Sequence, residues 1–404
     1  MNNNEISKND VEKIIDDIIL NINPYNKTKE CLDSFNYSDG KNILVSIGKA
    51  SWTMAKSVCD SIRIDEGVVI TKYNHSQGPI NGIKIYEAGH PIVDQNSIDA
   101  SEYVLSITSN LKENDNVIMC ISGGGSSLFE KPLINIESLQ DINDQLVKSG
   151  ASISEINVIR KRLSAVKGGK FAKHISPAKI HAIILSDVVG NDVGMIASGP
   201  IFDDESNVND AIEIANKYNI RINDNIKNLL LSKSDIHVDN VDYRIVGSVE
   251  QLCEYTKQSL EKYGFRTRII SNDCTDTIEE VTNKFKDIIN TNSEHNIAYI
   301  IGGEVNVSVK ANGFGGRNMH LALLVSRHIF KKDNTYFFSF ASDGTDGPTD
   351  GAGGFVDHYT YGYNDIEKYI ENFDSYTFLS KTNGLIKTGP TGCNINDVYV
   401  LLIR

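Results

Sequence analysis

Short runs of β-branched and other apolar residues alternate along this chain with longer amphipathic segments, a pattern typical of parallel sheets covered by helices. Several runs are almost continuously apolar, which indicates burial on both faces of a sheet. Helices fit residues 97–111, 249–263 and 277–289. The predicted strands span residues 42–47, 67–72, 116–121, 180–185, 243–246, 265–270, 297–301, 336–340 and 398–403.

One segment has a different pattern. Residues 304–310 alternate Val305, Val307 and Val309 with polar side chains, which predicts a strand with one exposed face. A second segment, residues 203–242, is polar and has few strand signals, so we place a domain boundary near its end.

The length of 404 residues is enough for two or three domains. We predict a two-domain α/β protein, with a Rossmann-like N-terminal domain of parallel sheet over residues 1–235. A smaller α/β domain is predicted over residues 236–404. A cleft between two such domains is a natural place for a ligand.

Composition excludes several classes of function. The formal net charge is −13, whereas nucleic-acid-binding proteins usually carry a basic patch, so no nucleic-acid partner is expected. No apolar run is long enough to span a membrane, and the first residues lack the order of a signal peptide. The six cysteines are far apart and form no C-x-x-C pair, which indicates free thiols in a reducing compartment. We therefore expect a cytoplasmic protein.

Two glycine-containing loops follow predicted strands, where ligands bind in open α/β sheets. In the first, Lys49 follows Gly48 at the start of a helix, where a cation and free backbone N–H groups can meet an anion. The second loop can hold a phosphate or a carboxylate, because three glycines allow its backbone to approach closely and form an anion nest. It consists of Ser122, Gly123, Gly124, Gly125, Ser126 and Ser127. It matches neither a Walker A loop nor a dinucleotide fingerprint.

Residues 154–171 read as one helix with an apolar stripe. Arg160 and Lys167 fall at the edge of that stripe, whereas Lys161 points away and is expected to be solvated. Because cations at such an edge are costly to bury without an anionic partner, Arg160 and Lys167 are candidates for substrate or phosphate binding. Simple snorkelling to the surface is the alternative.

Carboxylates and an arginine follow other strands. Asp187 ends the strand over 180–185 and could accept a hydroxyl proton or hold a metal. Arg317 opens a helix after a glycine-rich stretch, a good position for bidentate binding of phosphate or carboxylate. Asp343 and Asp346 lie in an aspartate-rich loop that could hold Mg²⁺ with Asp187, although turn formation is the better explanation of any single aspartate. The predicted nucleotide site comprises Gly302, Gly303, Glu304, Gly315, Gly316 and Asn318.

The nine histidines show no metal-ligand spacing, and His90 reads as a structural residue. No G-x-S-x-G elbow supports a serine hydrolase. The anion loops, fixed cations and carboxylates match the needs of phosphoryl transfer, in which positioning and electrostatics supply most of the rate. The residues alone do not name a substrate.

The same segments closely resemble the glycerate 2-kinases of the class that carries a MOFRL domain. They run in family order from about residue 43 to the end, and they are GKASWTMA, AGHPIVD, ISGGGSSL, EINVIRKRLSAVKGG, LSDVVGND with IASGP, GGEVNVSVKANGFGGRN, SDGTDGPTDGAGG and GPTGCNINDVYVLL. The departures are few: Ser342, Pro348 and the Ile-Val pair of AGHPIVD, none of which carries a predicted role.

The resemblance implies a kinase that uses ATP and Mg²⁺ to convert glycerate to 2-phosphoglycerate in a site between the two domains. It implies that Lys49 and Arg317 bind the reacting anions from opposite domains, with Asp187 as base or metal partner. The loop of residues 122–127 would hold phosphate or the glycerate carboxylate. The attack at the 2-hydroxyl comes from the resemblance only.

Two other functions stay open at this point. A hydroxypyruvate reductase, a label that this family has often carried, would need a dinucleotide site that the chain lacks. A non-enzymatic sugar- or nucleotide-binding regulator would bind without turnover. The expected partners are the small molecules glycerate and ATP, with a homodimer as the assembly considered.

Overall fold

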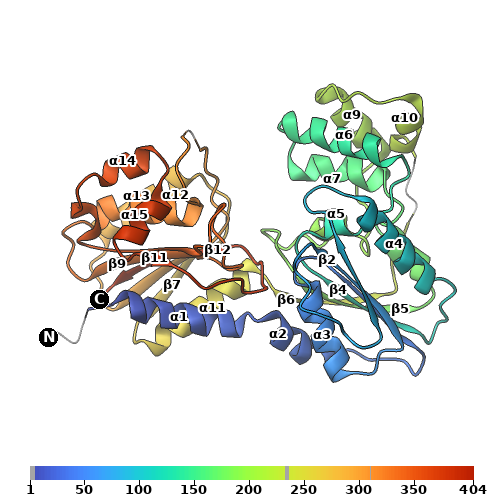
Figure 1. Cartoon of the computed structure of the whole chain (residues 1–404), viewed down its shortest axis with the longest axis horizontal. Coiled ribbons are helices and arrows are strands. Elements are labelled where there is room, and N and C mark those ends of the chain that lie inside the picture. Colours follow the sequence, from blue (N-terminus) through green and yellow to red (C-terminus); the bar gives the residue numbers. More distant parts are fainter. Residues whose placement is uncertain (1–4, 233–235, 310) are drawn as a thin grey trace. The chain divides into compact units, whose positions relative to one another are not determined.

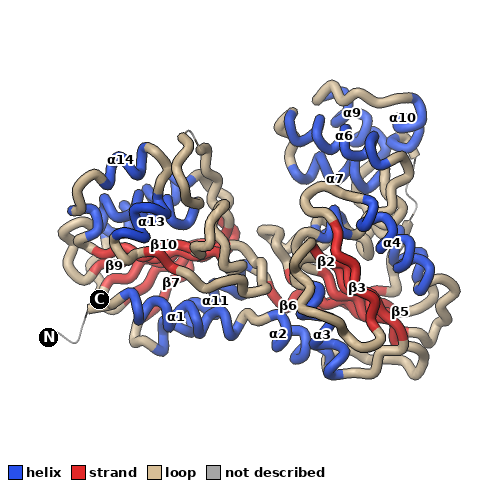
Figure 2. The backbone as a smooth tube through the Cα atoms, viewed as in Figure 1, coloured by secondary structure: helices blue, strands red, loops and turns tan. Residues whose placement is uncertain are grey.

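The computed structural model describes residues 5–232, 236–309 and 311–404 and divides into two compact units. One unit is Pro24–Val246, and the other combines Met1–Asn23 with Gly247–Arg404. Each unit contains a six-stranded sheet with helices packed on it (Figures 1 and 2). The predicted two-domain α/β class is confirmed.

The sheet of the first unit has the order β3-β2-β1-β4-β5-β6, the strand order of a Rossmann fold. The pairings from β3 through β5 are all parallel. Parallel strands need crossovers, and α3 and α4 supply them on opposite faces of the sheet (Figure 1). The strands are β1 (Asn42–Ile47), β2 (Glu66–Lys72), β3 (Ile83–Ala88), β4 (Asn116–Ile121), β5 (Lys179–Leu185) and β6 (Val241–Gly247).

The helices of this unit begin where the sequence offers caps. Asp94, Ser152 and Asn207 each accept a hydrogen bond from the third backbone N–H of a helix and complete a capping box. Four helices, α6, α7, α9 and α10, form a layer with a small apolar core of its own. The helices are α2 (Pro24–Leu32), α3 (Ser51–Ser61), α4 (Gln95–Ile107), α5 (Gly125–Leu128), α6 (Ile136–Lys148), α7 (Ile153–Arg162), α8 (Lys170–Ile175), α9 (Val208–Lys217) and α10 (Asp224–Leu230).

The sheet of the second unit is mixed, with the order β11-β10-β9-β12-β8-β7. Only β7 and β8 pair in parallel among its assigned pairings, and the others are antiparallel. The helices α1 and α11 cover one face, and α12, α13, α14 and α15 cover the other (Figure 1). The strands are β7 (Arg266–Cys274), β8 (Ile297–Gly303), β9 (Thr335–Ala341), β10 (Gly353–Asp357), β11 (Leu385–Ile386) and β12 (Asp397–Ile403). The helices are α1 (Lys8–Asn21), α11 (Val249–Lys262), α12 (Ile278–Thr291), α13 (Arg317–Ile329), α14 (Ile366–Glu371) and α15 (Ser375–Lys381).

The structure divides the chain differently from the predicted ranges 1–235 and 236–404. Strand β6 takes the edge of the first sheet beside β5, so residues 236–246 remain with the first unit. At the other end, α1 packs on α11 and buries Val11, Ile14 and Ile18 completely, which places residues 1–23 in the second unit. No helix was predicted over residues 8–21, and its partner α11 begins more than 200 residues later in the sequence.

Two local predictions are wrong. Residues 304–309 form no strand, because β8 ends at Gly303 and only an isolated bridge joins Asn306 to Thr277; Lys310 lies outside the described residues. Residues 154–171 are not one helix, because α7 ends at Arg162 and α8 begins only at Lys170. Between them Ser164 forms an isolated bridge with Pro132, and Gly168 and Gly169 adopt left-handed φ values of 60° and 77°.

Two of the class exclusions can be compared with the structure. Within the described parts of the chain, every helix is too short or too polar to cross a bilayer. All six cysteines are unpaired, as predicted, and all except the half-buried Cys59 are buried.

The core of the second unit depends on β12, its central strand. We expect Leu401→Ala to lower the free energy of unfolding of that unit by about 2–5 kcal/mol, because Leu401 is fully buried and the truncation leaves a cavity. The matched control Leu20→Ala removes a side chain that is 63% exposed on α1 and should change the free energy of unfolding by less than about 0.5 kcal/mol. Urea denaturation monitored by circular dichroism measures the free energy of unfolding of both variants. Equal losses of that free energy would contradict the assigned core.

Candidate active site

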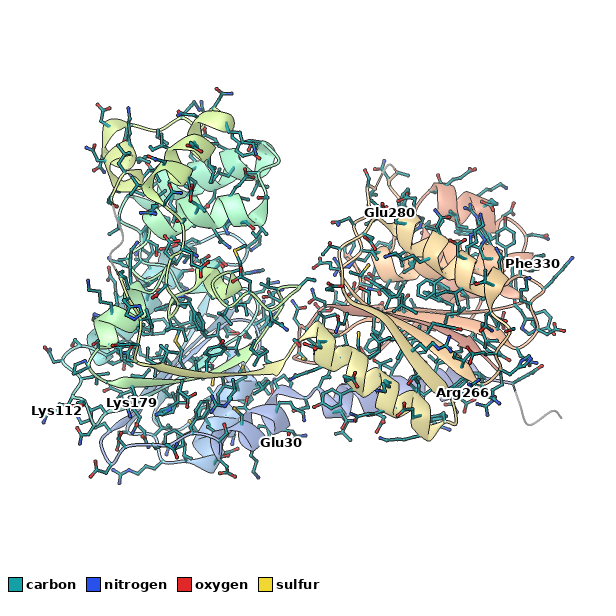
Figure 3. The ribbon with its side chains drawn as sticks, turned by 180° about the vertical axis from the view of Figure 1, so that it is seen from behind. Glu30, Lys112, Lys179, Arg266, Glu280 and Phe330 are labelled. Carbon is teal, nitrogen blue, oxygen red and sulfur yellow. The ribbon has the colours of Figure 1, made fainter. Side chains whose placement is uncertain are left out.

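The loops after β1 and β4 meet at the carboxyl edge of the first sheet. These strands are neighbours in register, with Ile47 opposite Ile121, and the chain leaves them in opposite directions, toward β2 and toward β5. Such a switch point opens a crevice in which α/β proteins bind ligands. Figure 3 labels Lys112 and Lys179 near the other, amino-terminal edge of the same sheet.

Hydrogen bonds join the two loops directly. The backbone N–H of Lys49 donates to the carbonyl of Gly123 over 2.9 Å, and the N–H of Ala50 donates to Ser122 Oγ over 3.0 Å. Ser122 is buried, and Ser127 Oγ donates to the Gly124 carbonyl within the loop. These two serines therefore shape the loop, and Ser126 is the loop serine that is half-exposed.

The loop glycines allow two other strand ends to approach. A Cβ on Gly123 would lie 2.4 Å from Asp187 Oδ2, beyond the end of β5. A Cβ on Gly124, whose φ is +87°, would lie 2.9 Å from His90 Cδ2 and 3.4 Å from Lys49 Cγ. The structure thus brings together Lys49, the loop of residues 122–127 and Asp187, as predicted from their positions after strands.

His90 is a site residue whose position the sequence analysis did not reveal. Burial lowers its pKa most, and together with the positive charges of Lys49 and Lys72 and the nearby His75 it brings the pKa to about 4. Burial likewise lowers the pKa of His75. At pH 7 the site therefore presents a neutral imidazole beside two lysines, an arrangement suited to an anionic ligand. Only the position of AGHP after an unpredicted strand, β3, could have indicated this.

Two of the three cations discussed for residues 154–171, Lys161 and Lys167, lie in other environments than predicted. The Lys167 amino group is fully buried, forms an ion pair with Glu130 over 2.8 Å and donates to the Phe129 carbonyl, so its predicted contact with substrate is wrong. Lys161 is not solvated; it is 9% exposed and lies 3.6 Å from a carboxylate oxygen of Asp204. Lys167 lies beyond the end of α7, outside the predicted single helix, whereas Lys161 lies on α7 beside a carboxylate from outside that helix.

Arg160 stays on α7 and faces the helical layer. Its Nε donates to Asn143 Oδ1 on α6 over 2.8 Å, and burial lowers the pKa of its guanidinium. A role for Arg160 in phosphate binding stays a prediction.

In the second unit, Arg317 begins α13 and lies between two carboxylates. Its Nε donates to Asp397 Oδ2 over 2.6 Å, and a second nitrogen pairs with Glu304. Asp397 is buried, which raises its pKa, while the positive charge of Arg317 opposes that rise. The Tyr399 hydroxyl also donates to Asp397, and the Tyr399 oxygen accepts a hydrogen bond from the Val305 N–H. Arg317 is therefore firmly held, and anion binding by it stays a prediction.

Asp346 has a structural role. Its two carboxylate oxygens accept the backbone N–H groups of Asn318 and Met319 over 3.1 and 2.8 Å, which caps α13 from a distant loop. Burial raises its pKa to about 7. Because this cap satisfies the first turn of α13, that helix start is not a vacant anion site, and metal binding by Asp346 stays a prediction.

The glycines predicted to bind a nucleotide are explained by packing within the unit. A Cβ on Gly302 would lie 2.2 Å from Cys253 Sγ, and one on Gly303 would lie 2.0 Å from the Cys274 carbonyl oxygen. Similarly, Gly315 faces Ser375 and Gly316 faces Asp346 at 2.2 and 2.3 Å. Asn318 is buried. Nucleotide binding by Gly302, Gly303, Glu304, Gly315, Gly316 and Asn318 stays a prediction.

A cavity of about 380 Å³ lies beside Arg317 in the second unit. It is open at the glycine-rich stretch and apolar on one side, where His320 stacks on Phe373. The residues lining it are Val307, Val309, Gly313, Gly315, Gly316, Arg317, His320, Thr345, Asp346, Gly347, Pro348 and Phe373.

The carboxylates predicted to hold a metal do not form one group within a unit. Asp187 is in the first unit, and Asp343 and Asp346 are in the second. Among residues 5–232, 236–309 and 311–404, no three His, Cys, Asp or Glu side chains lie close enough to hold a metal by themselves. Asp343 Oδ1 accepts the Thr345 N–H over 2.9 Å, as in an ordinary turn.

Known proteins resemble this chain over nearly its whole length. Residues 10–231 match the family model of a domain of unknown function, DUF4147, and residues 297–397 match the MOFRL family. A D-glycerate 2-kinase of Thermotoga maritima is 42% identical, with 99% of this chain and 97% of that protein covered. A glycerate 2-kinase of Pyrococcus horikoshii is 36% identical, with 90% and 88% covered.

Solved structures agree with these relatives. The crystal structure of a glycerate kinase from Thermotoga maritima superposes with a TM-score of 0.93 at 41% identity, covering 98% of both chains. A relative from Agrobacterium vitis that carries the name hydroxypyruvate reductase is 30% identical, with 90% of this chain and all of that protein covered.

The cation cluster at the crevice can be tested by titration. We expect NMR of the His90 ring to show a pKa of about 4, well below its ordinary value, and Lys49→Met to raise that pKa because a neighbouring positive charge is removed. The control Lys56→Met, on the helix α3 that follows Lys49 and paired with Asp60, should leave the pKa of His90 unchanged. A His90 pKa that does not respond to Lys49→Met would show that the two side chains are not neighbours.

Proposed function

This chain belongs to the glycerate 2-kinase family, and from this premise we propose that it transfers the γ-phosphoryl group of ATP to the 2-hydroxyl of D-glycerate. The products would be 2-phosphoglycerate and ADP. The observation that carries the proposal is the convergence of Lys49, the glycine loop and Asp187 at the switch point of a Rossmann-like sheet. Phosphoryl transfer needs such a combination of fixed cation, backbone cradle and carboxylate.

Each group at the switch point has a role in this proposal. Lys49 neutralises negative charge on the transferring phosphoryl group or the glycerate carboxylate, with the backbone of the 122–127 loop as a cradle. Asp187 accepts the proton of the attacking hydroxyl, since a carboxylate beside the loop is within reach of a ligand bound there. His90 remains neutral at pH 7, so it adds no charge of its own to the site that binds the anion.

Mg²⁺ is proposed as the metal. The ion commonly keeps several waters and uses one or two carboxylates together with substrate phosphates, so the lack of a three-residue cluster among the described side chains is compatible with it. Asp187 is the carboxylate that fits best, because it lies against the glycine loop that is proposed as the anion cradle. When bound, Mg²⁺ would neutralise charge on the phosphates of ATP.

In the second unit, Arg317 is proposed to bind an anionic group of the substrates. Asp397 is the buried partner that orients its guanidinium, and Glu304, whose side chain is 47% exposed, is the partner that an incoming anion can displace. We keep the cytoplasm as the proposed compartment, because six unpaired cysteines fit a reducing environment.

The reaction can be tested directly with the pure protein. Incubated with D-glycerate, ATP and MgCl₂, it should give a ³¹P NMR signal of 2-phosphoglycerate, and chelation of the metal with excess EDTA should abolish that signal. A parallel incubation with hydroxypyruvate and NADH or NADPH should leave the cofactor reduced. Formation of 3-phosphoglycerate would contradict the proposed position of attack, and oxidation of the cofactor would favour the reductase.

The role of Asp187 gives a second test. We expect Asp187→Asn to lower kcat by about 10²–10⁴, the range for loss of a positioned base, while the protein stays folded. The control Asp60→Asn removes an exposed carboxylate that pairs with Lys56 at the far end of α3 and should keep full activity. Comparable kcat values for Asp187→Asn and the unmodified protein would remove Asp187 from the mechanism.

A further inference from the structure

A short chain of hydrogen bonds leads from the glycine loop into the protein. Ser126 Oγ lies 3.0 Å from Ser198 Oγ, and Ser198 Oγ donates to Asn157 Oδ1 over 2.9 Å. The amide of Asn157 then reaches Met195, with its Nδ2 3.5 Å from the thioether sulfur. Ser198 and Asn157 are buried, whereas Ser126 is half-exposed at the loop.

The direction of every hydrogen bond in this chain follows from its inner end. A thioether sulfur has no proton and can only accept, so the Asn157 amide directs its N–H group at Met195 and its oxygen at Ser198. Ser198 has one hydroxyl proton, which is donated to that oxygen. The bond between the two serines must then be donated by Ser126, whose single proton points inward.

The backbone around Ser198 holds this arrangement in place. Ala197 and Ser198 are consecutive residues with φ values of 51° and 60°, a left-handed conformation that is unfavourable for non-glycine residues. The Ser198 carbonyl accepts the Gly168 N–H, and its N–H donates to the Met195 carbonyl. A Cβ on Gly125 would lie 2.7 Å from the Ala197 Cβ, so the strained turn is packed against the loop itself.

We propose that Ser126 is a specificity-determining residue whose oxygen accepts a hydrogen bond from a hydroxyl group of the acceptor substrate. Ser198 and Asn157 are positioning residues that turn the Ser126 proton away from that substrate. This changes the role expected of Ser126 from the sequence, since a hydroxyl with its proton engaged cannot donate to a phosphate or carboxylate. Lys49 and the loop backbone bind the anion, and Ser126 reads a hydroxyl beside it.

The identification of that substrate as glycerate rests on the proposed function. Glycerate carries two hydroxyls, and three simple acids separate them: lactate lacks the 3-hydroxyl, 3-hydroxypropionate lacks the 2-hydroxyl and propionate lacks both. Their binding can be measured by calorimetry without ATP, so recognition is measured separately from turnover.

We expect the unmodified protein to bind glycerate roughly 5- to 10-fold more tightly than one of the two singly deoxygenated acids, the effect of one hydrogen bond. Ser126→Ala should abolish that preference and leave propionate binding unchanged. The matched control Ser106→Ala removes an exposed hydroxyl on α4 and should change neither the preference for glycerate nor the binding of propionate. If Ser126→Ala weakens glycerate and propionate equally, Ser126 is an anion donor and the proposal is overturned. It is also overturned if Ser126→Ala changes nothing.

Ser198→Gly tests the positioning role. Glycine accepts the left-handed φ without strain, so this variant removes the hydroxyl while it favours the observed backbone. It frees the Ser126 proton to rotate, and we expect the hydroxyl preference to fall as far as in Ser126→Ala. A Ser198→Gly protein that folds and keeps the full preference overturns the positioning role. Hydroxyl preference without kinase turnover would support this inference and contradict the proposed function.

Discussion

The pairing of β1 with β4 is the constraint on which the candidate site depends. These two strands are adjacent in the sheet although more than 60 residues separate them in sequence, and the chain leaves them in opposite directions. The hydrogen bond from Lys49 to the Gly123 carbonyl then fixes one loop on the other. β5 flanks this pair and β3 lies beyond β2 in the same sheet, and the segments that follow β3 and β5 bring His90 and Asp187 to the same loop. The absence of side chains at Gly123 and Gly124 leaves room for both.

The second unit uses buried carboxylates in place of a backbone cradle. Asp397 and Asp346 are both almost fully buried, and each is matched to a specific donor, the guanidinium of Arg317 and the first turn of α13. Buried charges are tolerated when paired and hydrogen-bonded, so these contacts fix the start of α13 and its arginine as one rigid piece. The position of Asp346 also explains why a glycine is needed at 316, where a Cβ would lie 2.3 Å from that carboxylate.

Much of the fold and part of the site could be predicted from the sequence. Continuous apolar runs predict buried parallel strands such as β1 and β4, and the loops that follow these strands must lie at the carboxyl edge of the sheet. The edge strand β3 and the glycine-rich β10 have no such apolar run. Because β3 was not predicted, the place of His90 in the site was not predicted either. Lys167 was misjudged because helical periodicity was extended past Arg162, where α7 ends. Lys161 lies within α7 and was misjudged because a carboxylate from outside the helix lies beside it. Partners distant in sequence, such as Asp204 and Glu130, decide the burial of those lysines, and no local pattern reveals them.

The membership of α1 in the second unit has a consequence for how the chain can be built and divided. Residues 24–246 form an insertion within a unit whose first helix is made before the insertion and whose sheet is made after it. On the ribosome, the inserted unit can fold as soon as it emerges, whereas α1 must wait for α11 before its apolar face is covered. A C-terminal fragment that starts at Gly247 would therefore expose the surface of α11 that α1 normally covers, so a self-sufficient version of that unit needs residues 5–23 joined to it by a short linker.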